Sequence, residues 1–254
     1  MAVANRRLRQ PVIVVNNFSA SIMPSISIII PVAEHESCLL ALLEDLAKYA
    51  PHIHEVIVVG TNACPPPTLS AKTDHEKSLD IRYLSSNRGR GLQMNTGAEH
   101  AKGDYLWFLH ADSRVSASNI SELEMTLKKK PDALLCFKLA FYPENSLPLK
   151  LNAFGANMRS FIFGIPFGDQ GFCISRPLFE KTGAYPVCTP YGEDHLYVWK
   201  LKKMAIPVKT LQSTLLTSGR KYIDNGWLIT TLLHQYLWLK QLVQVCRIKS
   251  TKRL

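Results

Sequence analysis

The sequence predicts an α/β fold built on a single mixed, mostly parallel sheet that is flanked by helices. Short β-branched runs recur along the chain, and the first, SISIIIPV at residues 25–32, is typical of a strand buried on both faces. Segments with helical periodicity, such as CLLALLEDLAKYA at residues 38–50, separate these runs. Strands that alternate with helices through short links favour a parallel-dominated sheet.

The remaining elements are expected to continue this alternation. In the helix predicted at residues 116–130, the spacing of Asn119 and Glu122 indicates a capping box. Residues 61–78 are polar and rich in proline, as expected of a loop. Further strands are expected at residues 54–60, 81–84, 105–109, 132–142, 206–211 and 213–219, with a short strand and one helical turn within 171–183. Further helices are expected at residues 91–103, 148–164, 192–204 and 226–249, the last of them long and amphipathic.

The sequence contains no internal repeat and no interdomain linker, so one folded domain is expected at residues 25–222. Residues 1–24 are expected to be a disordered arm or to contain a misassigned start, with Met23 as the true initiator. Residues 223–254 are expected to hold the amphipathic helix and a basic tail.

The net charge of +10 lies mostly in the two tails. Three arginines in the first 24 residues and four basic residues in the last nine account for seven of the ten charges, and neither segment contains an acid. No aromatic–basic RNA motif or zinc finger is present, so nucleic acid is not an expected partner. The tail residues are Arg6, Arg7, Arg9, Arg247, Lys249, Lys252 and Arg253.

The six cysteines are scattered and form no CxxC pair, which is typical of reduced thiols in a cytoplasmic protein. The stretch RRLRQPVIVV at residues 6–15 resembles the start of a signal peptide, but NNFSAS interrupts the apolar run early. We therefore expect a cytoplasmic protein.

The C-terminal segment from Trp227 to Val245 is apolar but is interrupted by polar residues, so a membrane span is not expected. Two interpretations remain open. The helix packs on the folded domain, or it docks with the basic tail on anionic lipid at the inner face of the cell membrane. The interrupting residues are His234, Gln235, Lys240 and Gln241.

Ligands of open α/β sheets bind beyond the carboxyl ends of the strands. The segment PVAEHES after the first strand has no glycine, which argues against a dinucleotide site, and no P-loop is present. The strand at residues 105–109 leads into His110, Ala111 and Asp112. A carboxylate at such an edge suits Mg²⁺ or Mn²⁺, which use one or two carboxylates together with phosphate oxygens. The alternative is that Asp112 only caps the loop.

Four segments in order resemble the family 2 glycosyltransferases of the GT-A fold over residues 25–245. More narrowly, they resemble the bacterial radical-SAM/selenodomain-associated transferase subgroup. The segments are RGRGLQMNTGAEHAKGDYLWFLHADSR at 88–114, FGDQGFCISR at 167–176, GED at 192–194 and LTSGRKY at 216–222.

This resemblance implies a metal-dependent, inverting transferase that takes a sugar from a nucleoside-diphosphate donor to an unknown acceptor, which could be lipid-linked. Asp112 then binds the divalent metal, Mg²⁺ or Mn²⁺, and Arg220 neutralises the departing diphosphate or is simply a surface arginine. The residues that the resemblance places at the donor are Pro31, Glu34, Arg88, Arg90, Asn95, Gly97, His110, Ala111 and Arg220.

The pair Glu193–Asp194 matches the acidic pair of the inverting enzymes, which implies that Asp194 is the general base. An ionised carboxylate is favoured at a helix N-terminus. Glu193 is then expected to orient the loop or the acceptor. Asp169 and Gln170 match a motif on the acceptor side, where they either contact the acceptor or pin the loop.

Two nucleoside-binding positions depart from the family pattern. Gly60 replaces an aspartate at the end of the second strand, and Glu34 and His35 replace an asparagine and an acid after the first. These departures leave open a second hypothesis, in which a degenerate GT-A protein binds a nucleotide or a partner without turnover.

Overall fold

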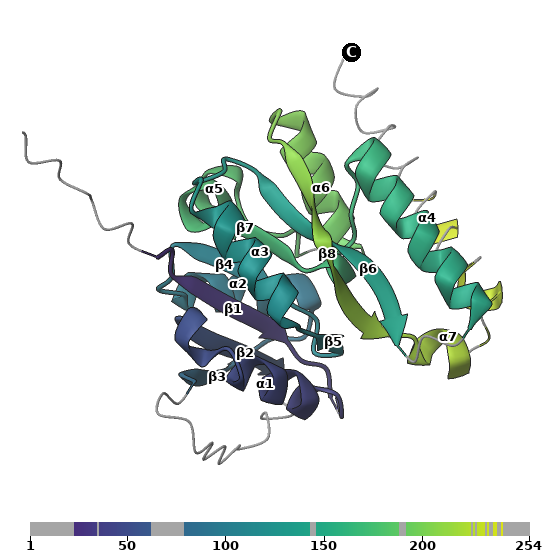
Figure 1. Cartoon of the computed structure of the whole chain (residues 1–254), viewed down its shortest axis with the longest axis horizontal. Coiled ribbons are helices and arrows are strands. Elements are labelled where there is room, and N and C mark those ends of the chain that lie inside the picture. Colours follow the sequence, from purple (N-terminus) through teal and green to yellow (C-terminus); the bar gives the residue numbers. More distant parts are fainter. Residues whose placement is uncertain are drawn as a thin grey trace, which may run out of the picture.

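The computed structural model describes residues 23–34, 36–61, 79–142, 146–187 and 192–224, followed by residues 226, 228–231, 233, 236, 237 and 240. Within these residues the chain forms an eight-stranded sheet in the order β3-β2-β1-β4-β7-β6-β8-β5 (Figure 1). The strands are β1 Ile26–Pro31, β2 Glu55–Thr61, β3 Ile81–Ser86, β4 Tyr105–Phe108, β5 Ser113–Arg114, β6 Leu134–Tyr142, β7 Phe172–Ser175 and β8 Val208–Ser218. The helices are α1 Leu39–Ala47, η1 Ala50–His52, α2 Arg90–His100, α3 Ala117–Leu127, α4 Leu147–Phe163, η2 Gly168–Gln170, α5 Arg176–Thr182, α6 Glu193–Lys203 and α7 Arg220–Asp224.

The predicted sheet type is confirmed. Strands β1 to β4 pair in parallel, and β6 pairs in parallel with β8. Only β7 and the short β5 run antiparallel to their neighbours within this sheet. The carboxyl ends of β1 and β4 therefore meet at one edge, next to the point where the strand order reverses.

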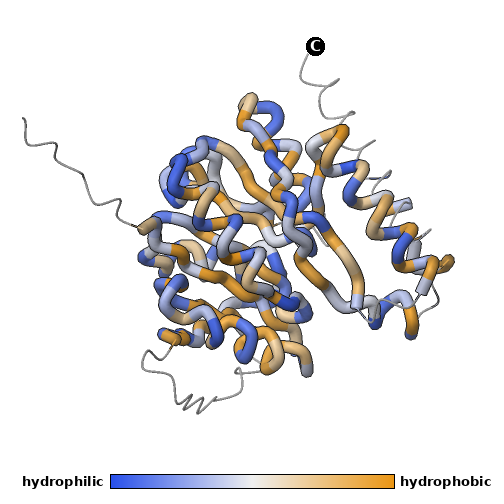
Figure 2. Tube along the Cα trace, viewed as in Figure 1, coloured by the Kyte–Doolittle hydropathy of each residue, from blue (hydrophilic) through white to orange (hydrophobic). Residues whose placement is uncertain are grey.

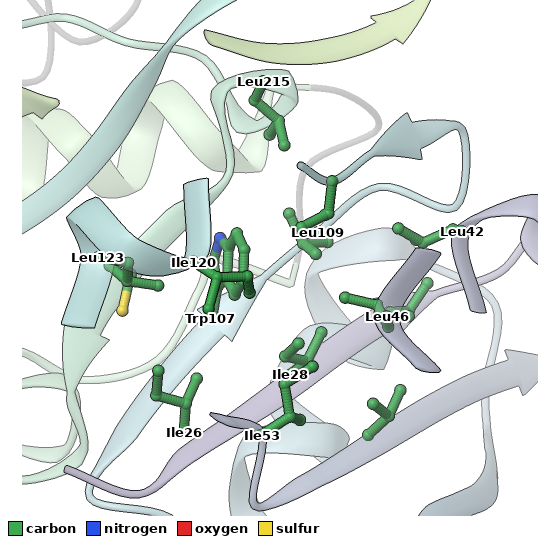
Figure 3. Close-up of a cluster of buried hydrophobic side chains, with 14 of the residues drawn as sticks. Ile26, Ile28, Leu42, Leu46, Ile53, Trp107, Leu109, Ile120, Leu123 and Leu215 are labelled. Carbon is green, nitrogen blue, oxygen red and sulfur yellow. The ribbon is translucent and has the colours of Figure 1, made fainter. Parts of the chain in front are cut away.

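Both faces of the central strands are buried, which explains why their sequences are continuously apolar (Figure 2). Ile28 and Ile30 of β1 face the cluster formed with α1 and α3, while Ile29 faces the opposite cluster with α2 and α6. Figure 3 shows the first cluster, to which Trp107 of β4 and Ile120 of α3 both belong. The packed helices on both faces fix the strand ends and their loops.

Two details of the prediction are wrong. The two strands expected at residues 206–219 are one strand, β8, with a register shift opposite Cys136 and Lys138 of β6. Glu122 accepts hydrogen bonds of 2.7 and 2.6 Å from the N–H groups of Gln212 and Ser213, which stabilises the irregular segment. Glu122 is thus not part of a capping box.

The capping box of α3 lies one turn earlier than predicted. Ser116 is the N-cap, and its N–H donates to Oδ1 of Asn119 at 3.0 Å. Most of the predicted N-terminal arm, His35, most of the loop at 61–78 and much of the predicted C-terminal helix lie outside the described residues. In the described part of the chain, no helix is long and apolar enough to cross a membrane.

Candidate functional site

The predicted site residues gather at the edge where β1 and β4 end and where α2 and α6 begin. Gln93 of α2 ties the strand ends together, because its side-chain amide donates 2.8 Å hydrogen bonds to the carbonyls of Val32 and Val59. Gly91 allows α2 to approach α6, since a Cβ there would lie 2.8 Å from the carbonyl of Pro186 and 3.4 Å from Cβ of Glu193. The two helix N-termini therefore lie side by side at this edge.

Asp194 lies in the first turn of α6 and is almost completely buried, with 7% of its surface exposed. Its Oδ2 accepts a 2.7 Å hydrogen bond from the N–H of Gly168, and its Oδ1 accepts a 2.8 Å bond from the N–H of His195. Burial alone would raise the pKa of Asp194, but the His195 side chain, whose Nδ1 lies 3.3 Å from Oδ1, and the charge of Arg90 hold it well below its ordinary value. Asp194 is therefore an ionised carboxylate at neutral pH.

Arg90 and Glu193 form an ion pair between the first turns of α2 and α6. The Glu193 side chain is buried, whereas 40% of the Arg90 side chain is exposed. Burial would lower the pKa of Arg90, but the charges of Asp194 and Glu193 raise it above its ordinary value. Arg90 thus compensates both acids of the pair.

His110 and Asp194 both lie close to Gly168. A Cβ at this position would lie 2.9 Å from Nε2 of His110 and 3.1 Å from Oδ2 of Asp194. Burial and the charge of Arg90 lower the pKa of His110 to about 3, so its imidazole is neutral at physiological pH. The structure therefore brings His110 and Asp194, which are far apart in the sequence, close to one glycine.

Asp112 follows β4 in a turn and is held mainly through its backbone. Its carbonyl accepts hydrogen bonds from the hydroxyl of Tyr142 at 3.0 Å and from the N–H of Ser218 at 3.2 Å. The carboxylate accepts a long bond, of 3.4 Å, from Oγ1 of Thr217. Burial raises the pKa of Asp112, and Glu36 adds to this effect.

The surroundings of Asp112 suit a carboxylate that is the one protein ligand of a hard cation. A bound cation would offset the burial of the Asp112 carboxylate, which has little other hydrogen bonding. No group of three or more His, Cys, Asp and Glu side chains is arranged to hold a metal ion in the part of the chain that the structure describes. A cation at Asp112 would therefore need oxygens from a diphosphate and from water.

Asp169 and Gln170 lie side by side in η2 but have different surroundings. Oδ1 of Asp169 is buried and accepts no hydrogen bond from the described residues. Burial raises the pKa of Asp169 to about 6. The side chain of Gln170 is fully buried and pins the loop, because it donates to the carbonyl of Phe137 and accepts from Ser160 and the N–H of Phe167.

Arg220 at the start of α7 reaches the loop after β1. It forms an ion pair of 3.3 Å with Glu36 and donates a 3.2 Å hydrogen bond to Ser37. Arg88 and Glu34 are exposed at the same edge of the sheet. These three predicted residues are thus accessible, whereas Asp194 and Glu193 are buried.

The other predicted donor residues have packing roles in this structure. Gly97 brings α2 onto β1, as predicted, because a Cβ there would lie 2.5 Å from Cγ2 of Ile29. The amide of Asn95 donates to the carbonyl of Tyr185 and accepts from its N–H, both at 2.9 Å. Pro31 and Ala111 are buried at their strand ends. A donor contact for any of these residues stays a prediction.

Sequence reasoning missed Gln93, Gly168 and Glu36. Gln93 lies inside a helix that was otherwise assigned to the site, and an amide on its buried face was an available signal. The partners of Gly168 and Glu36 are 26 and 184 residues away, so no local pattern indicates them.

Most of the described sheet lies in a segment that is similar to a known protein family. The family model described as "Glycosyl transferase family 2" matches residues 27–183, which is more than half of the chain. No curated protein matches the chain by sequence.

Solved structures of TarS from S. aureus have a similar fold. One has a TM-score of 0.58 at 17% identity over 78% of this chain and 37% of that chain. A shorter TarS structure, 1–349, has a TM-score of 0.56 at 18% identity over 76% and 60% of the two chains. The same portion in complex with UDP-GlcNAc gives 0.56 and 18% over 76% and 58%. This chain thus spans between 37% and 60% of those structures, and the likeness concerns the GT-A type of fold.

Proposed function

Because the chain belongs to glycosyl transferase family 2 and is therefore a glycosyltransferase, we propose that it is an inverting enzyme that uses a nucleoside-diphosphate sugar and a divalent metal. The observation that carries the proposal is the meeting of Asp194, His110 and Asp112 at one edge of the sheet. The TarS complex with UDP-GlcNAc supports a nucleotide-sugar donor.

Asp194 is the proposed general base. A sugar hydroxyl is a poor nucleophile at neutral pH, so a positioned carboxylate must accept its proton in the transition state. The two N–H groups from Gly168 and His195 fix the orientation of the Asp194 carboxylate. The lowered pKa of Asp194 keeps it ionised but also weakens it as a base, so its contribution depends mainly on position. Glu193 orients this turn through Arg90.

The donor diphosphate is proposed to bind between Asp112 and the exposed Arg88 and Arg220. A divalent metal bound at Asp112 would neutralise the diphosphate and stabilise the leaving group. Arg220 and the exposed Lys221 begin α7 close to this carboxylate, and both charges act on its pKa. The N-terminus of α2, which follows Arg88, has no side-chain cap and offers free N–H groups to an anion. Arg220 would have to leave Glu36 to contact the diphosphate.

His110 and η2 are proposed to shape the space between donor and acceptor. The neutral imidazole of His110 can accept or donate a hydrogen bond without adding charge. Asp169 is proposed to face the acceptor side, with Gln170 holding the loop in place. The proposal leaves the sugar and the acceptor unassigned, with a lipid-linked acceptor as one option.

The base of the donor is proposed to be recognised loosely. Gly60, the residue before the last one of β2, has no carboxylate to accept a hydrogen bond from the base, and the loss is about 1.5–3 kcal/mol. The four segments of this chain that resemble the radical-SAM/selenodomain-associated subgroup support its membership of that subgroup. A cytoplasmic location, at the inner face of the membrane, remains part of the proposal.

The test is release of nucleoside diphosphate from a panel of nucleotide sugars, with Mn²⁺ and with excess chelator. We expect release that needs the metal and is similar for two or more bases. Metal-dependent binding of nucleoside diphosphates without release from any donor would instead support the degenerate alternative. A preference of more than about a hundredfold for one base would contradict the role given to Gly60.

A further inference from the structure

Helix α4 has the reverse of the usual distribution of residues on a surface helix. Small and polar residues face the sheet: Ala153 and Ser160 are buried, and Asn157 bonds both backbone groups of Leu139 in β6 at 2.8 and 2.9 Å. Leu149 and Ala153 complete a small cluster with Leu139 and Phe141. A helix on a globular domain normally turns its large apolar residues inward.

Apart from Leu149, the large apolar residues of α4 point outward. Positions 147, 151, 154, 158 and 161 are spaced by four, three, four and three residues, so they lie on one side of the helix. Each of the outward residues is more than 40% exposed. They are Leu147, Leu151, Phe154, Met158, Phe161, Ile162 and Phe163.

A second group of exposed apolar residues lies next to this helix. The side chain of Asn152 in α4 donates a 3.0 Å hydrogen bond to Thr231, which joins α4 to the segment after α7. Figures 1 and 2 show α4 at the outer edge of the molecule, with α7 close to one end and hydrophobic residues recurring along the helix. The exposed residues of this second group are Ile223, Leu228, Ile229, Leu233 and Tyr236. Together the two groups form what we call the α4 face.

The sequences of α4 and of the segment from Arg220 onward are basic. Helix α4 carries Lys150 and Arg159 and no acidic residue. From Arg220 to the C-terminus, Asp224 is the only acid in the sequence. The basic residues of that segment are Arg220, Lys221, Lys240, Arg247, Lys249, Lys252 and Arg253.

We propose that the α4 face docks on the surface of an anionic lipid membrane. Clustered apolar side chains on a convex helix, with Lys150 beside them and no acid on α4, match an interfacial membrane-binding surface. Phenylalanine and tyrosine side chains such as Phe154, Phe161 and Tyr236 suit the boundary between headgroups and acyl chains. A second copy of the chain would present the same positive charge, so self-association through this face would bring like charges together.

Docking would place the candidate site close to the lipid. Helix α4 ends at Phe163 and leads through Gly164 to η2, which holds Asp169 and Gly168. Arg159 of α4 stacks 3.5 Å from the ring centre of Phe167, so the helix and this loop are packed together. This consequence for the acceptor, a hydroxyl presented at the lipid surface, rests on the proposed function. The docking surface itself does not.

The experiment is co-sedimentation of the full chain with vesicles of phosphatidylcholine alone and of phosphatidylcholine with phosphatidylglycerol. We expect binding to the anionic vesicles that exceeds binding to the neutral ones. The double variant Phe154→Ser/Phe161→Ser should lower the partition coefficient at least about tenfold, because two exposed aromatic side chains leave the interface. The matched control is Met125→Ser, which removes an equally exposed apolar residue of α3 and should bind like the original chain.

Thermal melts establish that the variants are folded, and calorimetry with a nucleoside diphosphate and Mn²⁺ reads the donor site independently. We expect both to be unchanged in the double variant. Binding of the double variant equal to that of the original chain would overturn the proposal, as would no binding of the original chain to either vesicle. A concentration-dependent dimer that the double variant dissolves, without lipid binding, would assign the α4 face to a second copy. If neither the original chain nor any variant binds nucleoside diphosphate, while vesicle binding is as expected, only the proposed function is contradicted.

Discussion

The N–H of Gly168 donates a 2.7 Å hydrogen bond to Oδ2 of Asp194. A Cβ on the same glycine would lie 2.9 Å from Nε2 of His110 and 3.1 Å from Oδ2 of Asp194, so no side chain fits at residue 168. This contact joins the loop after β4, the η2 turn and the start of α6 in one site. It also means that the position of Asp194 depends on the absence of a Cβ at residue 168.

The variant Gly168→Ala should therefore lower turnover by about tenfold to a hundredfold, because overpacking of 1–3 kcal/mol would push the Asp194 carboxylate and His110 apart. The measurement is the metal-dependent release of nucleoside diphosphate under steady-state conditions. Gly155→Ala is the matched control, since a Cβ on that residue of α4 meets nothing within 4 Å. Equal activity of both variants would show that the position of Asp194 does not matter for the reaction.

The variant Asp194→Asn should lower turnover at least about a hundredfold and leave donor affinity nearly unchanged, because it removes a base that acts in the transition state. The structure adds a cost to stability. The new amide must turn one N–H toward the N–H of Gly168 or of His195, which costs about 1–3 kcal/mol. Turnover and affinity are therefore compared well below the melting temperature of the variant.

Two results would change the assignment of Asp194. Loss of donor binding in proportion to the loss of rate would make it a donor-binding or structural residue. Full activity of Asp194→Asn would move the base elsewhere, with Asp169 as the next candidate.

The variant Asp112→Ala should abolish the metal-dependent part of nucleoside diphosphate binding without unfolding the protein. The fold should persist because the hydrogen bonds that hold this turn use the backbone carbonyl of Asp112. Calorimetry with Mn²⁺ and with chelator measures the effect. Asp224→Ala is the control, since it removes an exposed acid of α7. Unchanged metal-dependent binding in Asp112→Ala would exclude this carboxylate as the metal ligand.

The sequence was sufficient for features that depend on neighbouring residues. The strand at residues 25–32 and the helix at 148–164 were found because apolar periodicity is local, and both agree with the structure within two residues. The sequence was not sufficient where the contacts of a residue depend on a partner far away in the chain. Glu122 was expected at a helix cap because of its spacing, but the N–H groups of Gln212 and Ser213, about 90 residues away, bind it instead.

The candidate site shows the same division. The motif order placed Asp112, Asp194 and Arg90 near one strand edge, and the structure brings them to that edge. The hydrogen bond from Gly168 to Asp194 could not be predicted, because nothing in the sequence next to either residue indicates the other. Helix α4 was predicted correctly as a helix, but its outward apolar face depends on which side meets β6.

The variant Asp169→Asn should make the protein more stable at neutral pH. Burial raises the pKa of Asp169 to about 6, from an ordinary value of 3.8, so the folded state holds a proton that the unfolded state has released. The ionised form therefore lowers stability, progressively from about pH 4 to pH 6 and fully above that. The cost is about 3 kcal/mol for a buried carboxylate oxygen that accepts no hydrogen bond from the described residues.

Asparagine removes the charge, so Asp169→Asn should be about 2–3 kcal/mol more stable than the original chain at pH 8 and equally stable near pH 4. Urea unfolding at the two pH values, with chelator present, measures the difference. Asp45→Asn is the control of opposite sign: burial would raise the pKa of Asp45, but hydrogen bonds from Arg114 and Lys48 lower it. That variant should lose stability at pH 8. If Asp169→Asn also loses stability at pH 8, the ionised Asp169 stabilises the fold. It is then not a destabilising group that is retained for contact with the acceptor.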